Sequence, residues 1–352
     1  MNMRSQTVRW TVGVIAAIIF IVILRLKPWQ KAQDPDLHIA PGSGAKQSME
    51  VAFIPVTCHL TCPITDFASK TSETGTRFDA RRFSEFPTIV ESLKSKKILA
   101  GFLTVPLAMK LREQKAPVRI CCLGHRDGSQ IVIRKENGAK NLADLKGKTI
   151  AIPSFLSNEN FVFHKVMREQ GLNEDDIKFV VLPPPDMNAA LATKSIDGFF
   201  VAEPFCSKSE LDGTGRVLYY GKDLWPNYIS CCLVVHEDLI KTRPEVVKDL
   251  VRGILQSGEW AETNRADAAK LAAGPFRQDE KLLKYILTAN PKRVSYRMLN
   301  PTDEELQKIM DMGLKIGQLK VKTSLAELMD RDFIPTEIHA AVIDMSKVGK
   351  IN

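Results

Sequence analysis

The sequence lacks the short motifs that commonly carry catalysis. None of its six histidines belongs to an H-E-x-x-H pattern, and there is no G-x-S-x-G elbow, P-loop or G-x-G-x-x-G turn. The C-x-x-C pairs of structural zinc sites are absent as well. The formal net charge is +8, but no basic helix or aromatic-interleaved basic patch follows the first 30 residues. These absences argue against an enzyme and against a nucleic-acid partner, and we expect no cofactor.

The cysteine count is seven, and an odd number excludes complete pairing within one chain. Cys58 and Cys62 are separated by three residues, with His59 between them, a spacing compatible with a soft metal ion or a disulfide. The adjacent pairs Cys121-Cys122 and Cys231-Cys232 lie in apolar stretches, where cysteine acts as a small hydrophobe. Free thiols are the favoured interpretation, and no metal site is expected.

The N-terminus carries a targeting segment. Trp10 to Leu24 is an uncharged run of 15 residues, shorter than the about 20 of a typical spanning helix. Arg4 and Arg9 precede the run, so we expect the N-terminus to stay inside and the remaining chain to lie outside the cytoplasm. No small-x-small cleavage site and no lipobox cysteine follow. An uncleaved signal-anchor in the inner membrane is therefore favoured over a cleaved signal peptide.

Length and composition suit a globular chain of two ordinary domains. The chain has 352 residues, of which 44% are hydrophobic and 26% charged. Residues 30–47 contain two prolines, two glycines and one serine and are expected to form a flexible tether between the membrane segment and the folded part.

The stretch from Leu145 to Phe205 has the clearest pattern. Thr149–Ile152, Lys178–Leu182 and Ile196–Val201 are apolar runs typical of strands, and helical patterns at Phe161–Gln170 and Met187–Ala192 separate them. The order β-α-β-α-β has crossovers long enough to return each strand in parallel. It predicts an α/β fold with a buried sheet, in which ligands bind beyond the carboxyl ends of the strands.

Polar residues follow each of these three strands. Ser154, Asn158 and Glu159 come after the first, and Glu203 comes after the third. The first loop runs directly into a helix, whose free backbone N–H groups can bind an acceptor on a small ligand. Ser157 or Asn158 is also suited to cap that helix, which is the simpler structural role. Glu203 has a structural or ligand-positioning role as its simpler interpretation, ahead of a general base.

The preceding part of the chain repeats the plan. Met49–Val56, Arg77–Phe83 and Ile98–Leu103 are strand candidates with a helix pattern at Phe86–Lys96. Four polar residues at the ends of the first and third of these strands are predicted to face the same cleft: Thr57, His59, Thr61 and Thr104. Val118–Leu123 and Gln130–Arg134 are further strands, with a loop expected at Gly124–Ser129.

Three motifs resemble one family of transport proteins. They are DLKGKTIAIP, IKFVVLPPPDMNAALATKSIDGFFVAEPF and DLWPN, within a similarity that covers about residues 49–330. The chain resembles the nitrate/sulfonate/bicarbonate group of ABC-transporter solute-binding proteins, which includes taurine, alkanesulfonate and thiamine-precursor binders. The resemblance implies two Rossmann-like lobes of the type II periplasmic-binding-protein fold, joined near Ile131–Lys135 and Ser230–Val235. The implied segments are 1–29, 30–47, 48–132 (lobe 1), 133–232 (lobe 2) and 233–352 (lobe 1).

The sequence departs from the family where an anion is held. Nitrate and bicarbonate binders use a histidine and a lysine at positions that fall at Glu159 and Cys231 here. A carboxylate repels an oxyanion, so an amine, amino-pyrimidine or amide-bearing ligand becomes more plausible than the family name implies. Arg126 and the helix after Ser157 nevertheless offer groups for a sulfonate or carboxylate. Trp225 is suited either to stack on the ligand or to fill space beneath the hinge.

The expectation is a membrane-tethered, extracytoplasmic binding protein that delivers a small ligand to an ABC permease and its ATPase. The main alternative is a ligand sensor that uses the same fold to signal to a membrane partner. An enzyme on this fold, such as a pyrimidine-forming relative, is a third and less favoured alternative.

Overall fold

The structure is a computed structural model. It describes residues 47–56, 69, 71–289, 292–340 and 342, all of which belong to one compact unit. The predicted membrane segment, nearly all of the predicted tether, and Thr57, His59 and Thr61 lie outside the described residues. Cys58 and Cys62 lie outside them too.

The first sheet is mixed and has six strands. Its order is β11 (Val294–Ser295), β4 (Val118–Asp127), β10 (Ile229–His236), β3 (Ala100–Leu103), β1 (Gln47–Phe53) and β2 (Thr76–Arg82). β1 is parallel to both of its neighbours, whereas β10 runs antiparallel to β3 and β4. The central strands β3 and β10 are buried throughout, which explains their continuous apolar sequences.

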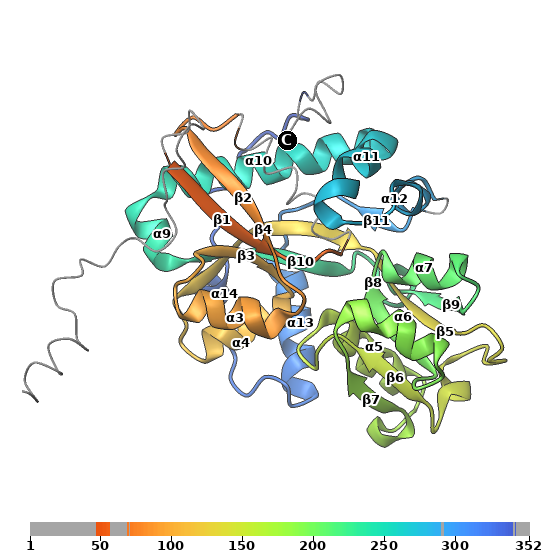
Figure 1. Cartoon of the computed structure of the whole chain (residues 1–352). Helices are drawn as coiled ribbons and strands as arrows, with labels where there is room; N and C mark the ends of the chain where they lie inside the picture. The colour runs from red at the N-terminus through yellow and green to blue at the C-terminus, as the bar shows by residue number, and fades with distance from the viewer. Residues whose placement is uncertain (1–46, 57–68, 70, 290–291, 341, 343–352) are drawn as a thin grey trace, which may run out of the picture. The chain divides into compact units, whose positions relative to one another are not determined.

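Eight helices follow the strands of this sheet within the described residues, and together with it they are called lobe 1. They are α3 (Phe86–Lys94), α4 (Val105–Glu113), α9 (Glu237–Thr242), α10 (Pro244–Thr263), α11 (Arg265–Phe276), α12 (Glu280–Thr288), α13 (Asp303–Lys315) and α14 (Leu325–Leu328). α13 begins with a capping box, in which Thr302 and Glu305 exchange hydrogen bonds, as the Thr-x-x-Glu pattern favours. This helix contacts both α4 and a helix of the second lobe, α5 (Asn158–Glu169) (Figure 1).

The second sheet has five strands and forms lobe 2 with its helices. Its order is β7 (Lys178–Val181), β6 (Thr149–Ile152), β8 (Gly198–Ala202), β5 (Ser129–Arg134) and β9 (Gly215–Tyr220). The helices are α5, α6 (Pro184–Ala192), α7 (Phe205–Leu211) and α8 (Gly221–Leu224). β6 is parallel to β7 and to β8, so the β-α-β-α-β order predicted from the sequence is confirmed.

The chain passes between the two sheets twice. The first passage is the turn at Asp127 and Gly128, whose φ angles are +59° and +88°. The second leads from β9 through α8 into β10. The loop predicted at Gly124–Ser129 is wrong in extent, because β4 continues through Asp127. Its polar residues stay in the strand because they have partners there; Arg126, for example, is ion-paired with Glu305.

Two apolar clusters form the core, one mainly in each lobe. Cys121, Cys122, Cys206 and Cys232 are buried free thiols, and Cys231 is buried as well. Burial raises the pKa of the Cys121 and Cys232 thiols, in keeping with the role of small hydrophobe predicted for the adjacent pairs. Within the part of the chain that the structure describes, no helix combines the length and the apolar character needed to cross a membrane.

Candidate functional site

The first turn of α5 brings polar side chains to the boundary between the lobes. The Ser157 hydroxyl caps the helix by accepting a hydrogen bond from the backbone N–H of Asn160 (3.2 Å). Asn158 and Glu159 follow in the first turn and are both buried. Ser154 plays a local role, since its hydroxyl accepts a hydrogen bond from the backbone N–H of Leu156 (3.0 Å). The cap predicted here therefore exists alongside two buried polar side chains.

Glu159 lies among hydroxyl groups from three segments. Its Oε1 accepts a hydrogen bond from the hydroxyl of Ser129, the first residue of β5, at 2.9 Å. Burial is the largest influence on this carboxyl and raises its pKa, while the hydroxyls of Ser129, Ser157 and Tyr228 act in the opposite direction. Tyr228 belongs to the segment that returns to lobe 1, so the carboxylate lies where lobe 2 meets both connections.

Asn158 ties α5 to the returning strand. Its Nδ2 donates to the backbone carbonyl of Ser230 in β10 at 2.6 Å, whereas its buried Oδ1 has no hydrogen-bond partner within the described residues. Next to Ser230, the Cys231 thiol lies 3.3 Å from Nδ1 of His125, and both residues are buried. The side of the site formed by β10 and β4 therefore carries polar groups, although most of the surrounding strand residues are apolar.

Thr104 connects the two lobes from the opposite side. It caps α4 in lobe 1, and its hydroxyl donates to the carbonyl of Leu156 in lobe 2 at 2.8 Å. Thr104 is only 4% exposed. The loop before α5 is thus in hydrogen-bond contact with both the first lobe and, through Asn158, the hinge strand.

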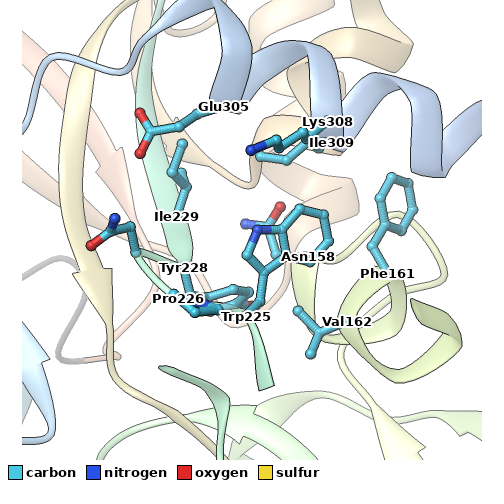
Figure 2. Close-up of a pocket in the computed structure, with 11 residues that line it drawn as sticks. Asn158, Phe161, Val162, Trp225, Pro226, Tyr228, Ile229, Glu305, Lys308 and Ile309 are labelled. Carbon is cyan, nitrogen blue, oxygen red and sulfur yellow. The ribbon is translucent and has the colours of Figure 1, made fainter. Parts of the chain in front are cut away.

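A cavity of about 100 Å³ adjoins Asn158 on the side of α13. Asn158, Phe161 and Val162 come from α5, and the segment 225–229 forms another part of the wall. Figure 2 shows Glu305, Lys308 and Ile309 entering from α13 opposite Asn158 and Trp225. Apolar and aromatic side chains alternate along the walls with four polar ones, Asn158, Asn227, Glu305 and Lys308.

Trp225 lines this cavity and packs against both apolar clusters. The Lys165 ammonium group lies 5.8 Å from the centre of its ring system. The indole therefore fills space beside the hinge and also presents a surface to the cavity, so the two roles considered from the sequence are compatible.

The guanidinium of Arg126 is engaged in hydrogen bonds with other groups of the protein. Its guanidinium binds the Glu305 carboxylate through two hydrogen bonds, at 2.7 and 3.0 Å, and also donates to the carbonyls of Met298 and Asn227. This pair fixes the start of α13 to the end of β4 and lowers the pKa of the Glu305 carboxyl. The hydrogen bonds of Arg126 are to α13 and to the segments at Met298 and Asn227, and none of them is to the first turn of α5, where an anion was considered.

Glu203 is buried in a network of its own. Its carboxylate accepts hydrogen bonds from the backbone N–H and hydroxyl of Ser207 and from Arg293, the last at 3.1 Å. The Arg293 guanidinium also lies near the rings of Tyr220 and Tyr285. This network joins α7 of lobe 2 to the segment before β11 of lobe 1, which gives Glu203 a contact between lobes.

Sequence reasoning missed Ser129, Tyr228 and Arg293. Ser129 was within an expected loop, and Tyr228 follows the DLWPN motif, so their positions at a strand start and near the return hinge were available signals. No local signal marks Arg293. Within the described residues, no group of three or more side chains is arranged to hold a metal ion.

Two α/β sheets, joined by two passages, with buried polar groups where the lobes meet, are the architecture of periplasmic solute-binding proteins. The chain belongs to the NMT1-like family, whose model matches residues 42–274. The predicted resemblance is thereby confirmed.

Several characterised proteins that resemble this chain are binding proteins. The taurine-binding periplasmic protein of Escherichia coli is 25% identical over 247 residues, which cover 66% of this chain and 76% of that protein. The periplasmic nitrate-binding protein NrtA of Synechocystis has a TM-score of 0.72 at 15% identity, covering 81% of this chain and 86% of that one. The aliphatic sulphonate-binding protein SsuA of Escherichia coli has a TM-score of 0.66 at 16% identity, covering 84% and 95%. These relatives are binding proteins and not enzymes.

Proposed function

We propose that the protein is the extracytoplasmic solute-binding component of an ABC importer. It captures a small polar organic molecule between its lobes and delivers it to the permease, and the ATPase drives uptake. The observation that carries the proposal is the polar cluster of Glu159, Asn158, Ser129 and Tyr228, buried where the two lobes and their connections meet. Family membership and the named relatives support the same role.

The proposed ligand contacts come from both lobes. Asn158, Glu159 and Ser154 act from the lobe 2 side and Thr104 from the lobe 1 side, with Thr57, His59 and Thr61 after β1. Trp225 shapes the hinge side of the site. Arg126 and Glu203 support the binding geometry indirectly, because each already has a charged partner within the protein. No catalytic residue and no cofactor belong to this function.

Binding itself is tested by native mass spectrometry of the purified protein. A small molecule should be retained, and Asn158→Leu should release it because this variant removes the amide and closes part of the cavity. Lys194→Gln, at an exposed turn of lobe 2, is the matched control and should retain the molecule. Loss from both variants, or from neither, would contradict binding at the lobe boundary.

Delivery is tested with the permease and its ATPase in proteoliposomes. The loaded protein should stimulate ATP hydrolysis, whereas Asn158→Leu should not. A protein that binds its ligand but leaves the ATPase rate unchanged would exclude the transport role.

We also propose that residues 1–29 tether the protein to the inner membrane with the folded part outside the cytoplasm. Basic residues precede the apolar run and no cleavage motif follows it, which supports a retained anchor. N-terminal sequencing of protein extracted from membranes is expected to find the intact start. A mature chain that begins near Ala45 would exclude the anchor while leaving export in place.

A further inference from the structure

The buried carboxylates differ in how their charge is balanced. Four carboxylate residues are buried among those the structure describes: Glu159, Glu203, Asp249 and Glu262. Three have an arginine partner, in the pairs Glu203–Arg293 at 3.1 Å, Asp249–Arg252 at 2.7 Å and Glu262–Arg265 at 2.7 Å. Glu159 has no ion pair within the part of the chain that the structure describes, and its Oε2 makes no hydrogen bond of ordinary geometry there. It is therefore the exception among these four.

The protein only partly compensates the charge on Glu159. Hydroxyls and the amino end of α5 contribute partial positive charges, which stabilise an anion less than a full positive charge does. A carboxylate that is 4% exposed and lacks an ion pair among the described residues is costly for the folded state. Natural proteins retain such groups where function requires them.

The location of Glu159 indicates what balances it. The carboxylate lies beside Ser129, the first residue of β5, and Tyr228, the residue before β10, so each of these neighbours stands at the end of one passage between the lobes. The neighbour of Glu159 in the chain, Asn158, lines the cavity that adjoins α13. We propose that Glu159 takes its counter-ion from the ligand, as a protonated amine or amidinium group, so that the site selects cationic or zwitterionic molecules over simple oxyanions. This inference rests on the proposed solute-binding function.

A matched pair of sulfonates tests the selection. Taurine carries an ammonium group, and isethionate carries a hydroxyl at the same position. Calorimetry on the full chain in detergent is expected to show at least about tenfold tighter binding of taurine, because the charged hydrogen bond to Glu159 is lost in isethionate. Glu159→Gln should abolish most of this preference. Equal binding of isethionate, or an unchanged preference in the variant, would overturn the inference and leave solute binding intact.

The Glu159→Gln variant also tests whether the Glu159 carboxyl binds the ligand as an anion or as a neutral acid. Glutamine resembles a neutral acid in shape and in hydrogen bonding. If Glu159 acts as a neutral acid, the variant should bind taurine as tightly as the natural protein does, which again overturns the inference.

Thermal stability tests the unbalanced charge without any ligand. In ligand-free protein, Glu159→Gln should melt at the same or a higher temperature, because an uncompensated charge is removed. Glu203→Gln is the matched control and should melt several degrees lower, because Arg293 loses a buried partner. If Glu159→Gln lowered the melting temperature as much as Glu203→Gln does, the protein itself would already balance the Glu159 charge, and the inference would be overturned. This comparison needs no ligand, so it tests the inference even if neither sulfonate binds.

Discussion

Asp127 is the residue whose titration should affect stability most directly. It lies in the turn between β4 and β5, and burial, opposed by Lys222 and Arg126, raises its pKa from 3.8 to about 6. The folded chain therefore holds this proton more tightly than the unfolded chain. Stability is expected to fall as the pH rises from about 4 to about 6 and to stay lower above that range.

Asp127→Asn should remove this loss. Asparagine tolerates the positive φ of +59°, so the variant should gain about 1–2 kcal/mol at pH 7 and little at pH 4. Urea unfolding across this pH range measures the difference. Asp127→Ala is the control for backbone strain and should gain less at pH 7. A parallel pH profile for Asp127→Asn and the natural protein would contradict the assignment.

For single residues, the local sequence predicts helix caps better than it predicts ion-pair partners. Ser157 and Thr302 act within a few residues of their own position, so their patterns are readable locally. By contrast, Arg126 pairs with Glu305, which lies 179 positions further along the chain, and Glu203 pairs with Arg293, which lies 90 positions further along. Because no local pattern reports such separations, the sequence could not show that both side chains have charged partners within the protein.

Among the elements of lobe 2, apolar periodicity located β5, β6, β7, β8, α5 and α6, but it did not locate all of their ends and it missed α7, β9 and α8. The helix expected from Phe161 begins at Asn158, because its first turn is polar and still buried. β4 likewise continues through His125 and Arg126, whose polar groups find partners in β10 and α13. Polar residues at element ends break the apolar pattern, and these are also the residues that form the site.

The packing of α13 on α5 depends on one missing side chain. A Cβ on Gly313 would lie 2.9 Å from the Phe161 ring and 2.7 Å from Leu319. Gly313→Ala should therefore destabilise the protein by about 1–3 kcal/mol, although alanine is the better helix former. A Cβ on Gly138, in an exposed loop, would meet no atom within 4 Å and the backbone there is not left-handed, so Gly138→Ala is the control and should gain about 0.4–1 kcal/mol. Chemical denaturation compares the two, and a gain at both positions would contradict close contact between α13 and α5.

At the scale of the whole molecule, contacts from distant segments hold the lobes together. Thr104 and Leu156 join α4 to the loop before α5, and Asn158 joins that loop to β10. Each contact is a hydrogen bond, worth about 0.5–1.5 kcal/mol net. Beside the buried Glu203–Arg293 pair, such modest hydrogen bonds are compatible with the lobe separation that the proposed ligand entry requires.

Thr104→Val tests this balance between separate and closed lobes. The variant keeps the size of the side chain but loses the hydrogen bond to Leu156, which should shift the equilibrium toward separate lobes by roughly two- to tenfold. Small-angle scattering of ligand-free protein should then give a larger radius of gyration than in the natural protein, and ligand affinity should fall by a similar factor. Thr104→Ser restores the hydroxyl and should reverse both changes. If Thr104→Val and Thr104→Ser scatter identically, the contact between Thr104 and Leu156 does not contribute to closure.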